Sequence, residues 1–153
     1  MTQTLRVAIL VPLLLGGITV LCTILIHGLA VIATVNFFRR ERRLGHTGTT
    51  FRVDFAIVAI VLSCAFMAHL VEIALWTVLF LLCGEFQAFG TAYYFSAVNY
   101  TTLGYGDIIM SPSWKLLGPL EASDGCLMFG VSTAMIFAVI QRLILARFED
   151  LRE

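Results

Sequence analysis

The chain has 153 residues, of which 59% are hydrophobic and 13% charged, and its formal net charge at pH 7 is zero. A soluble domain carries about 25% charged residues, so this composition indicates one domain that mostly faces lipid. The neutral charge balance argues against a nucleic-acid-binding surface, and no nucleic acid is expected as a partner.

The first predicted element is an additional N-terminal transmembrane helix, residues 1–38. Its apolar run from Leu5 to Phe38 exceeds the roughly 20 residues that a spanning helix needs. A cleaved signal peptide is the competing interpretation, because Arg6 precedes the run. The run is too long for such a peptide, and cleavage near Ala30 would leave the following basic loop outside the cell. A retained helix is therefore predicted.

Residues 39–53 are predicted to form a basic cytoplasmic loop, in which arginines outnumber the single acidic residue, Glu41. The arginines are Arg39, Arg40, Arg42, Arg43 and Arg52. Short loops rich in Lys and Arg stay in the cytoplasm. The N-terminus is therefore expected outside, the C-terminus in the cytoplasm, and the next helix runs from the inside to the outside.

Residues 54–83 are predicted to form the second spanning helix. His69, Glu72 and Trp76 lie on one face of it, at spacings of three and four residues. A carboxylate inside a membrane is costly and invites a functional hypothesis. The preferred interpretation is that Glu72 hydrogen-bonds His69 or the helix that follows. A modulatory role in sensing protons or ions is the alternative.

The central feature is the stretch T-T-L-G-Y-G-D, residues Thr101–Asp107, which we call the filter motif. It follows an aromatic stretch predicted as a half-length helix over 89–101, and apolar helices flank both. Gly104 and Gly106 can adopt positive φ without a Cβ clash. Successive residues can then alternate between left-handed and right-handed backbone conformations, so that their carbonyls point at one axis. The Thr102 hydroxyl would lie at the inner end.

The filter motif resembles the selectivity filter of the tetrameric potassium channels, with Leu103 where that family usually has Val. The resemblance covers about residues 54–145, within a predicted pore domain of residues 54–148, and it implies an all-α membrane protein that assembles as a homotetramer. Each subunit would have three transmembrane helices, a re-entrant pore helix 89–101, a filter 102–106 and an inner helix 116–145. The implied ion ligands are Thr102, Leu103, Gly104, Tyr105 and Gly106, with K⁺ held by the first four.

Residues around the filter are predicted to support it, namely Thr101, Asp107, Tyr94 and Asn99. Val98 stands where certain bacterial pores place an acidic residue that pairs with the filter aspartate. Asp107 is therefore expected to bind another partner, such as Tyr94, Asn99 or Trp114. Four carboxylates are expected at or near the outer mouth, either to raise the local cation concentration or simply to keep that surface soluble. They are Glu85, Asp107, Glu121 and Asp124.

The inner helix carries three further predictions. Glu121 and Asp124 are expected in its first turn, where the helix dipole favours anions, and Glu121 is a candidate modulatory residue. Gly130 is either a gating hinge, as the resemblance implies, or a small residue for close helix packing. The candidate lining residues of a central cavity are Val131, Ala134 and Ala138.

The expected function is passive, potassium-selective conduction across the cell membrane. The expected location is a bacterial inner membrane. A non-selective cation channel of the same fold is the alternative, followed by a non-conducting scaffold. No catalytic motif is present, so we expect that the protein is not an enzyme and has no small-molecule substrate. The expected cofactors are K⁺ ions in the filter, and no organic cofactor is expected. Membrane lipid is the other expected partner. Cys83 and Cys126 are expected near the outer face, as free thiols in preference to a disulfide.

Overall fold

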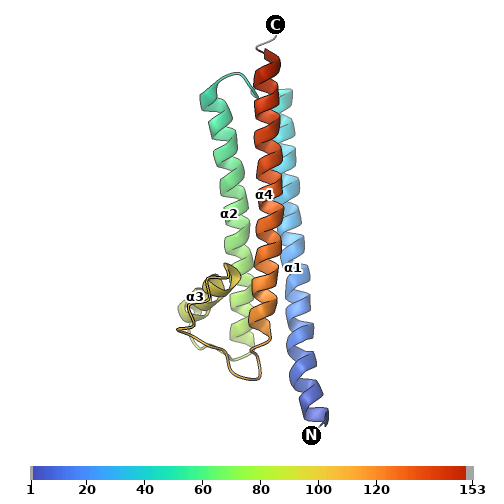
Figure 1. Ribbon diagram of the computed structural model, residues 1–153, viewed down its shortest axis with the longest axis vertical. Coiled ribbons are helices and arrows are strands. Elements are labelled where there is room, and N and C mark those ends of the chain that lie inside the picture. Colours follow the sequence, from blue (N-terminus) through green and yellow to red (C-terminus); the bar gives the residue numbers. More distant parts are fainter. Residues whose placement is uncertain (1, 151–153) are drawn as a thin grey trace. The chain divides into compact units, whose positions relative to one another are not determined.

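The computed structural model describes the backbone of residues 2–150 and the side chains of residues 9–148. Figure 1 shows four helices in this range: α1 (Thr2–Arg43), α2 (Phe51–Leu82), α3 (Phe89–Tyr100) and α4 (Leu117–Asp150). Three stretches are long and apolar enough to cross a membrane, namely Ile9–Arg43, Phe51–Leu82 and Leu117–Phe148. The predicted all-α membrane architecture with three spanning helices is confirmed.

The short helix α3 differs from the others because it cannot cross a bilayer. Its 12 residues rise only about 18 Å, against a hydrocarbon core of about 30 Å. The chain after α3 returns through irregular backbone to Leu117, where α4 begins. Figure 1 shows this return as the long loop that joins α3 (yellow) to α4 (orange to red).

Helix α1 continues past Phe38 to Arg43, so four of the five arginines expected in a loop lie in this helix instead, and the fifth, Arg52, lies in α2. Arginine is a good helix former, and basic side chains are favourable near a helix C-terminus. The connection to α2 is correspondingly short. It turns at Gly45 and Gly48, whose φ values of +71° and +79° suit glycine.

Contacts divide the chain into two compact units, and each helix except α3 contributes to both. The first unit contains the residues up to Ile26 together with His69–Met128. Its apolar core joins α2, α3 and α4, around Trp76, Phe80, Phe95, Tyr100 and Leu117. Leu15 and Val20 of α1 pack against this core. The unit therefore holds α3 between longer helices and fixes where the filter motif begins.

The second unit contains His27–Ala68 together with the residues from Phe129 onward. Its core is built from Ile57 and Val61 of α2 with Val139 and Leu143 of α4, and Phe37 and Phe38 of α1 pack against it. Two polar contacts fix the start of α2. Gly48 N donates to Asp54 Oδ1 at 2.9 Å, and Arg147 Nη2 lies 3.8 Å from Asp54 Oδ2.

Candidate functional site

Helix α3 ends in a turn that places Thr102 in a left-handed conformation. The amide of Thr102 donates to the carbonyl of Asn99, and the amide of Leu103 donates to that of Val98, both at 2.9 Å. This pair of bonds is the Schellman ending, whose left-handed position usually holds glycine. Here it holds Thr102, with φ of +60°, which is strained for a β-branched side chain.

Two further residues of the filter motif have left-handed backbone conformations. Gly104 has φ of +55° and Gly106 of +74°, so left-handed residues occur at every second position from Thr102. All residues of the motif are exposed, and Leu103 and Tyr105 are 55% and 66% exposed. In the described part of the chain, no donor reaches the carbonyl oxygens of residues 102–106. Such oxygens can coordinate a dehydrated monovalent cation.

Asp107 closes the motif and is held by α3. The Tyr94 hydroxyl donates to Asp107 Oδ2 at 2.8 Å, so Tyr94 is the partner among the three proposed from the sequence. This hydrogen bond is also the main reason that the pKa of Tyr94 is raised, because the carboxylate accepts the phenol proton only while the phenol is neutral. Tyr94 and Asp107 thus couple the end of the motif to the helix before it.

Glu121 is the main link between α3 and α4. It is fully buried, and its carboxylate accepts from Ser96 Oγ at 2.5 Å and from Asn99 Nδ2 at 2.8 Å. Asn99 also donates to the carbonyl of Gly118 at 2.9 Å. Asn99 therefore supports the motif indirectly, by fixing the last turn of α3 to the start of α4.

The expected location of Glu121 and Asp124 in the first turn of the inner helix is wrong. Helix α4 begins at Leu117 and has no acidic residue in its first turn. The helix dipole acts mainly within that turn, so it does not account for these carboxylates. Their stability comes from hydrogen bonds that other helices donate.

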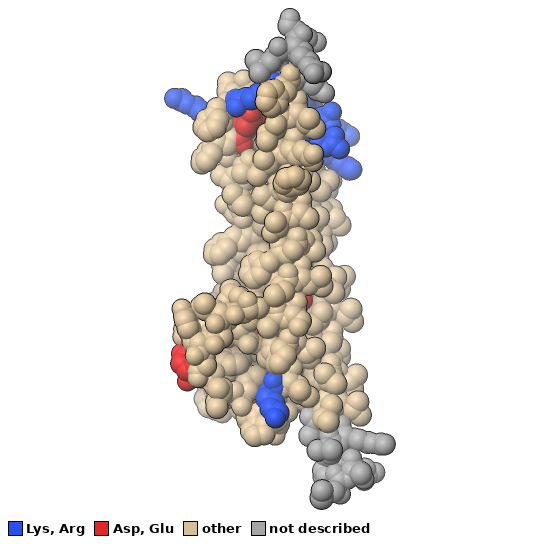
Figure 2. All heavy atoms as spheres, in the orientation of Figure 1, with Lys and Arg blue, Asp and Glu red and all other residues tan. Residues whose placement is uncertain are grey.

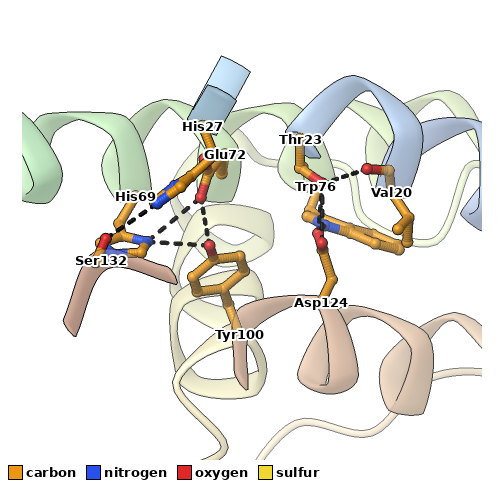
Figure 3. Close-up of polar contacts among 9 residues, drawn as sticks. All are labelled: Val20, Thr23, His27, His69, Glu72, Trp76, Tyr100, Asp124 and Ser132. Atoms are coloured by element: carbon orange, nitrogen blue, oxygen red, sulfur yellow. Dashed lines mark hydrogen bonds and ion pairs between the residues drawn. The ribbon is translucent and has the colours of Figure 1, made fainter. Parts of the chain in front are cut away.

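Asp124 joins three helices in the first unit. Thr23 Oγ1 of α1 lies 2.8 Å and 2.9 Å from its two carboxylate oxygens, and Trp76 Nε1 of α2 donates to Oδ2 at 2.9 Å. Figure 3 shows both groups pointing at the carboxylate from separate helices. Neither Thr23 nor Ser96 was predicted to be a functional residue. Hydroxyl residues in apolar helices are the signal that could have found them.

Glu72 forms a third buried carboxylate cluster, with His69 and Tyr100 (Figure 3). Tyr100 Oη donates to Glu72 Oε2 through a short hydrogen bond, and His69 Nδ1 lies 3.3 Å from the same oxygen and 3.1 Å from Tyr100 Oη. Glu72 therefore contacts both partners proposed from the sequence, His69 and the helix before the filter. These contacts fix α2 to the end of α3.

The expected ring of four carboxylates at the outer mouth is not what the structure shows. Glu121 and Asp124 are buried, and Glu85 accepts from the Ser111 hydroxyl at 2.8 Å. Asp107 is the exposed member of the set, and it is already bonded to Tyr94. Buried carboxylates serve helix packing here and add little to the field at the surface.

The predicted residues of α4 differ in their surroundings. Gly125 touches α3, since a Cβ built on it would lie 2.0 Å from the carbonyl oxygen of Tyr100. Gly130 has open space within 4 Å, so this protomer gives no packing reason for it. Val131, Ala134 and Ala138 are exposed, and their role in a cavity stays a prediction. All four cysteines are free, including Cys83 and Cys126.

The comparison with protein families finds a match. A family described as ion channel matches residues 55–142, which is more than half of the chain. This range contains α2, α3, the filter motif and most of α4. Neither the curated proteins nor the solved structures give a match. The chain therefore belongs to the family of two-transmembrane-helix ion channels, and it carries α1 in addition to the matched region.

Proposed function

We propose that this chain forms a homotetrameric, potassium-selective channel in which four filter motifs meet on one axis. The observation that carries the proposal is the backbone of residues 102–106, where left-handed residues alternate and carbonyl oxygens lack donors within the described chain. Unpaired carbonyls at membrane depth are tolerated where they are buried in protein or line a path for water or ions.

The proposed mechanism is replacement of the hydration shell of the ion by main-chain oxygens. The carbonyls of Thr102, Leu103, Gly104 and Tyr105, with the Thr102 hydroxyl, would bind K⁺ in successive layers. One chain supplies only one side of each layer, so closure of the ring needs four copies. Assembly would also cover Leu103 and Tyr105, which are more than half exposed in the single chain.

The surrounding elements support conduction of a cation. The C-terminal end of α3 carries a partial negative charge, and in a tetramer four such ends would converge below the filter. The topology follows from the basic end of α1. With the arginines in the cytoplasm, α2 runs from the inside to the outside of a cell membrane, as a re-entrant α3 requires.

The proposal is tested by planar-bilayer recording from the purified chain in mixed potassium and sodium solutions. The reversal potential should follow the potassium gradient. Gly104→Ala and Gly106→Ala should abolish the current, because both positions have positive φ, which an L side chain adopts with strain. Gly90→Ala is the matched control, since it lies in α3 with open space around it and without positive φ.

Each other outcome has a definite meaning. Equal permeability to sodium and potassium would make the protein a non-selective cation channel. A stable assembly that passes no current in any salt would make it a non-conducting scaffold. Normal current from both glycine variants would exclude the carbonyl mechanism.

A further inference from the structure

The second unit contains a groove between α1 and α4, and its wall includes Val131 and Ala138, two of the three residues predicted to line a central cavity. Its volume is about 630 Å³. Apolar side chains line most of it, and three arginines from the two helices stand at one end, namely Arg39, Arg42 and Arg142. A groove with an apolar wall and a cationic end has the chemistry of an amphiphile site.

The α1 wall of the groove is a regular stripe. Val31, Val35, Phe38, Arg39 and Arg42 recur at the spacings that place residues on one face of a helix. From Val31 to Arg42 the helix rises about 16 Å, close to half of the roughly 30 Å hydrocarbon core. The stripe therefore has the depth of one membrane leaflet.

The α4 wall repeats this pattern. Val131, Met135, Ala138 and Arg142 follow the same spacing, and this stripe also ends in an arginine. Figure 1 shows these parts of α1 and α4 running in the same direction, so the arginines of the two stripes lie at the same end of the groove. Two apolar stripes of leaflet depth thus converge on one cationic end.

The arginines of the groove are available to an anionic ligand. Across the side chains that the structure describes, none of the three forms an ion pair or a side-chain hydrogen bond. The nearby carboxylates are otherwise engaged, because Glu41 binds His46 at 2.7 Å and Asp54 faces Arg147. Figure 2 shows blue Lys and Arg atoms gathered at this end of α1. Three guanidinium groups close together repel one another unless an anion joins them.

We propose that the groove binds an anionic phospholipid from the leaflet at the arginine end. Its phosphate would lie against Arg39, Arg42 and Arg142, and an acyl chain would follow the two apolar stripes. Guanidinium groups bind phosphate through paired hydrogen bonds, and basic pockets between transmembrane helices bind anionic head groups. The site would couple α1, which lies outside the matched channel region, to the inner part of α4.

The test measures lipid retained by the purified assembly in native mass spectrometry. The assembly is equilibrated with mixed micelles that contain phosphatidylglycerol or phosphatidylcholine. The wild-type chain should retain phosphatidylglycerol, and phosphatidylcholine should not displace it. The triple variant Arg39→Gln, Arg42→Gln, Arg142→Gln should bind it roughly a hundredfold more weakly, at about fivefold per arginine.

The matched control is Arg40→Gln, Arg43→Gln, Arg52→Gln, which removes the same charge from the same end of the molecule but outside the groove. It should retain the lipid. A second variant, Ala138→Trp, fills the apolar part and keeps every arginine, and it should expel the lipid as well. Circular dichroism and size-exclusion chromatography check that each variant is folded and assembled.

Several results would overturn the proposal. Equal loss of lipid in both arginine variants would mean general surface charge. Displacement by inorganic phosphate alone would mean a head-group site without an acyl chain. If Ala138→Trp changes the oligomeric state and leaves lipid binding intact, the groove is an interface with a second copy. None of these results depends on ion selectivity, so the test is independent of the proposed function.

Discussion

Gly125 shows at the scale of one residue how closely α4 approaches α3. A Cβ built at this position would lie 2.0 Å from the carbonyl oxygen of Tyr100 and 3.2 Å from its ring. The oxygen belongs to the backbone, so it cannot move away without shifting the end of α3. Because the filter motif follows Tyr100 directly, the size of residue 125 bears on the position of the motif.

Gly125→Ala is therefore expected to destabilise the assembly by about 1–3 kcal/mol or more, as overpacking does in a tight core. Thermal unfolding of the purified protein measures the change. Gly17→Ala is the control, because nothing lies within 4 Å of a Cβ there. Equal stability of the two variants would contradict the close approach.

Cys83 gives a second prediction for a single residue. Burial, and then the charge of Glu85, raise the pKa of its thiol. The thiolate is the reactive form, so a raised pKa means less thiolate at neutral pH. Alkylation of Cys83 should be slower than that of a small free thiol, and its rate should continue to rise with pH after the free thiol has levelled off.

Glu85→Gln removes the smaller of the two causes, so the pKa of Cys83 should fall and the alkylation rate at fixed pH should increase. Peptide mass spectrometry on a background of Cys22→Ser, Cys64→Ser, Cys126→Ser follows the reaction at Cys83 alone. A rate profile identical to that of the small thiol would show that Cys83 is not perturbed.

At the scale of elements, α3 depends on its neighbours. A helix of 12 residues is marginal by itself in water, so side-chain anchors decide its position. Ser96 and Asn99 bind Glu121 of α4, and Tyr100 binds Glu72 of α2. Both anchors are buried carboxylates, Glu121 and Glu72. They hold the helix through hydrogen bonds, which are directional.

Ser96→Ala should destabilise the protein by about 1–3 kcal/mol, because Glu121 stays buried with one donor fewer. Denaturant unfolding measures the loss, and under the proposed function bilayer recording should also show weaker discrimination against sodium. Ser123→Ala is the control, since Ser123 is exposed and its hydroxyl donates only to the carbonyl of Pro119 in its own helix. A similar loss in both variants would contradict the anchoring role.

The elements themselves were predictable, and so were the contacts of Asp107 with Tyr94 and of Glu72 with His69. The contact between α1 and α4 was not. Apolar runs longer than a bilayer predict α1, α2 and α4, and the glycines of the filter motif predict two of its three left-handed residues, but not Thr102. The role of Asp124 was missed, because its partner Thr23 lies 101 positions away and hydropathy carries no information on such pairs. The end of α1 was placed too early, because arginines suit a helix as well as a loop.

At the scale of the whole molecule, α1 belongs to the structure that carries the filter motif. The family match begins at residue 55, after α1 has ended. In the first unit Thr23 nevertheless binds Asp124, and Leu15 and Val20 pack on the core that holds α3. The additional helix therefore stabilises the channel region and is more than a membrane anchor.

A chain that starts at Leu44 is expected to assemble poorly, because Asp124 loses a donor and the core loses part of its cover. Thr23→Val should give a milder defect of about 1–3 kcal/mol, since it keeps the side-chain shape and removes the hydroxyl. Size-exclusion chromatography and thermal unfolding measure both changes.

Thr133→Val is the matched control for Thr23, because Thr133 is exposed and donates to the carbonyl of Phe129 in its own helix. It should behave as the wild type. If the shortened chain assembles normally, α1 is dispensable for the channel region.

The left-handed conformation of Thr102 lowers the stability of the single chain, whereas its hydroxyl is proposed to bind the ion during conduction. Glycine would relieve about 1–2 kcal/mol of backbone strain there but would remove the only side-chain hydroxyl that is proposed to bind the ion. A selection for heat resistance alone should therefore enrich Thr102→Gly, and a selection for growth on scarce potassium should eliminate it. Opposite results from these two screens would mark Thr102 as a trade-off between folding and transport.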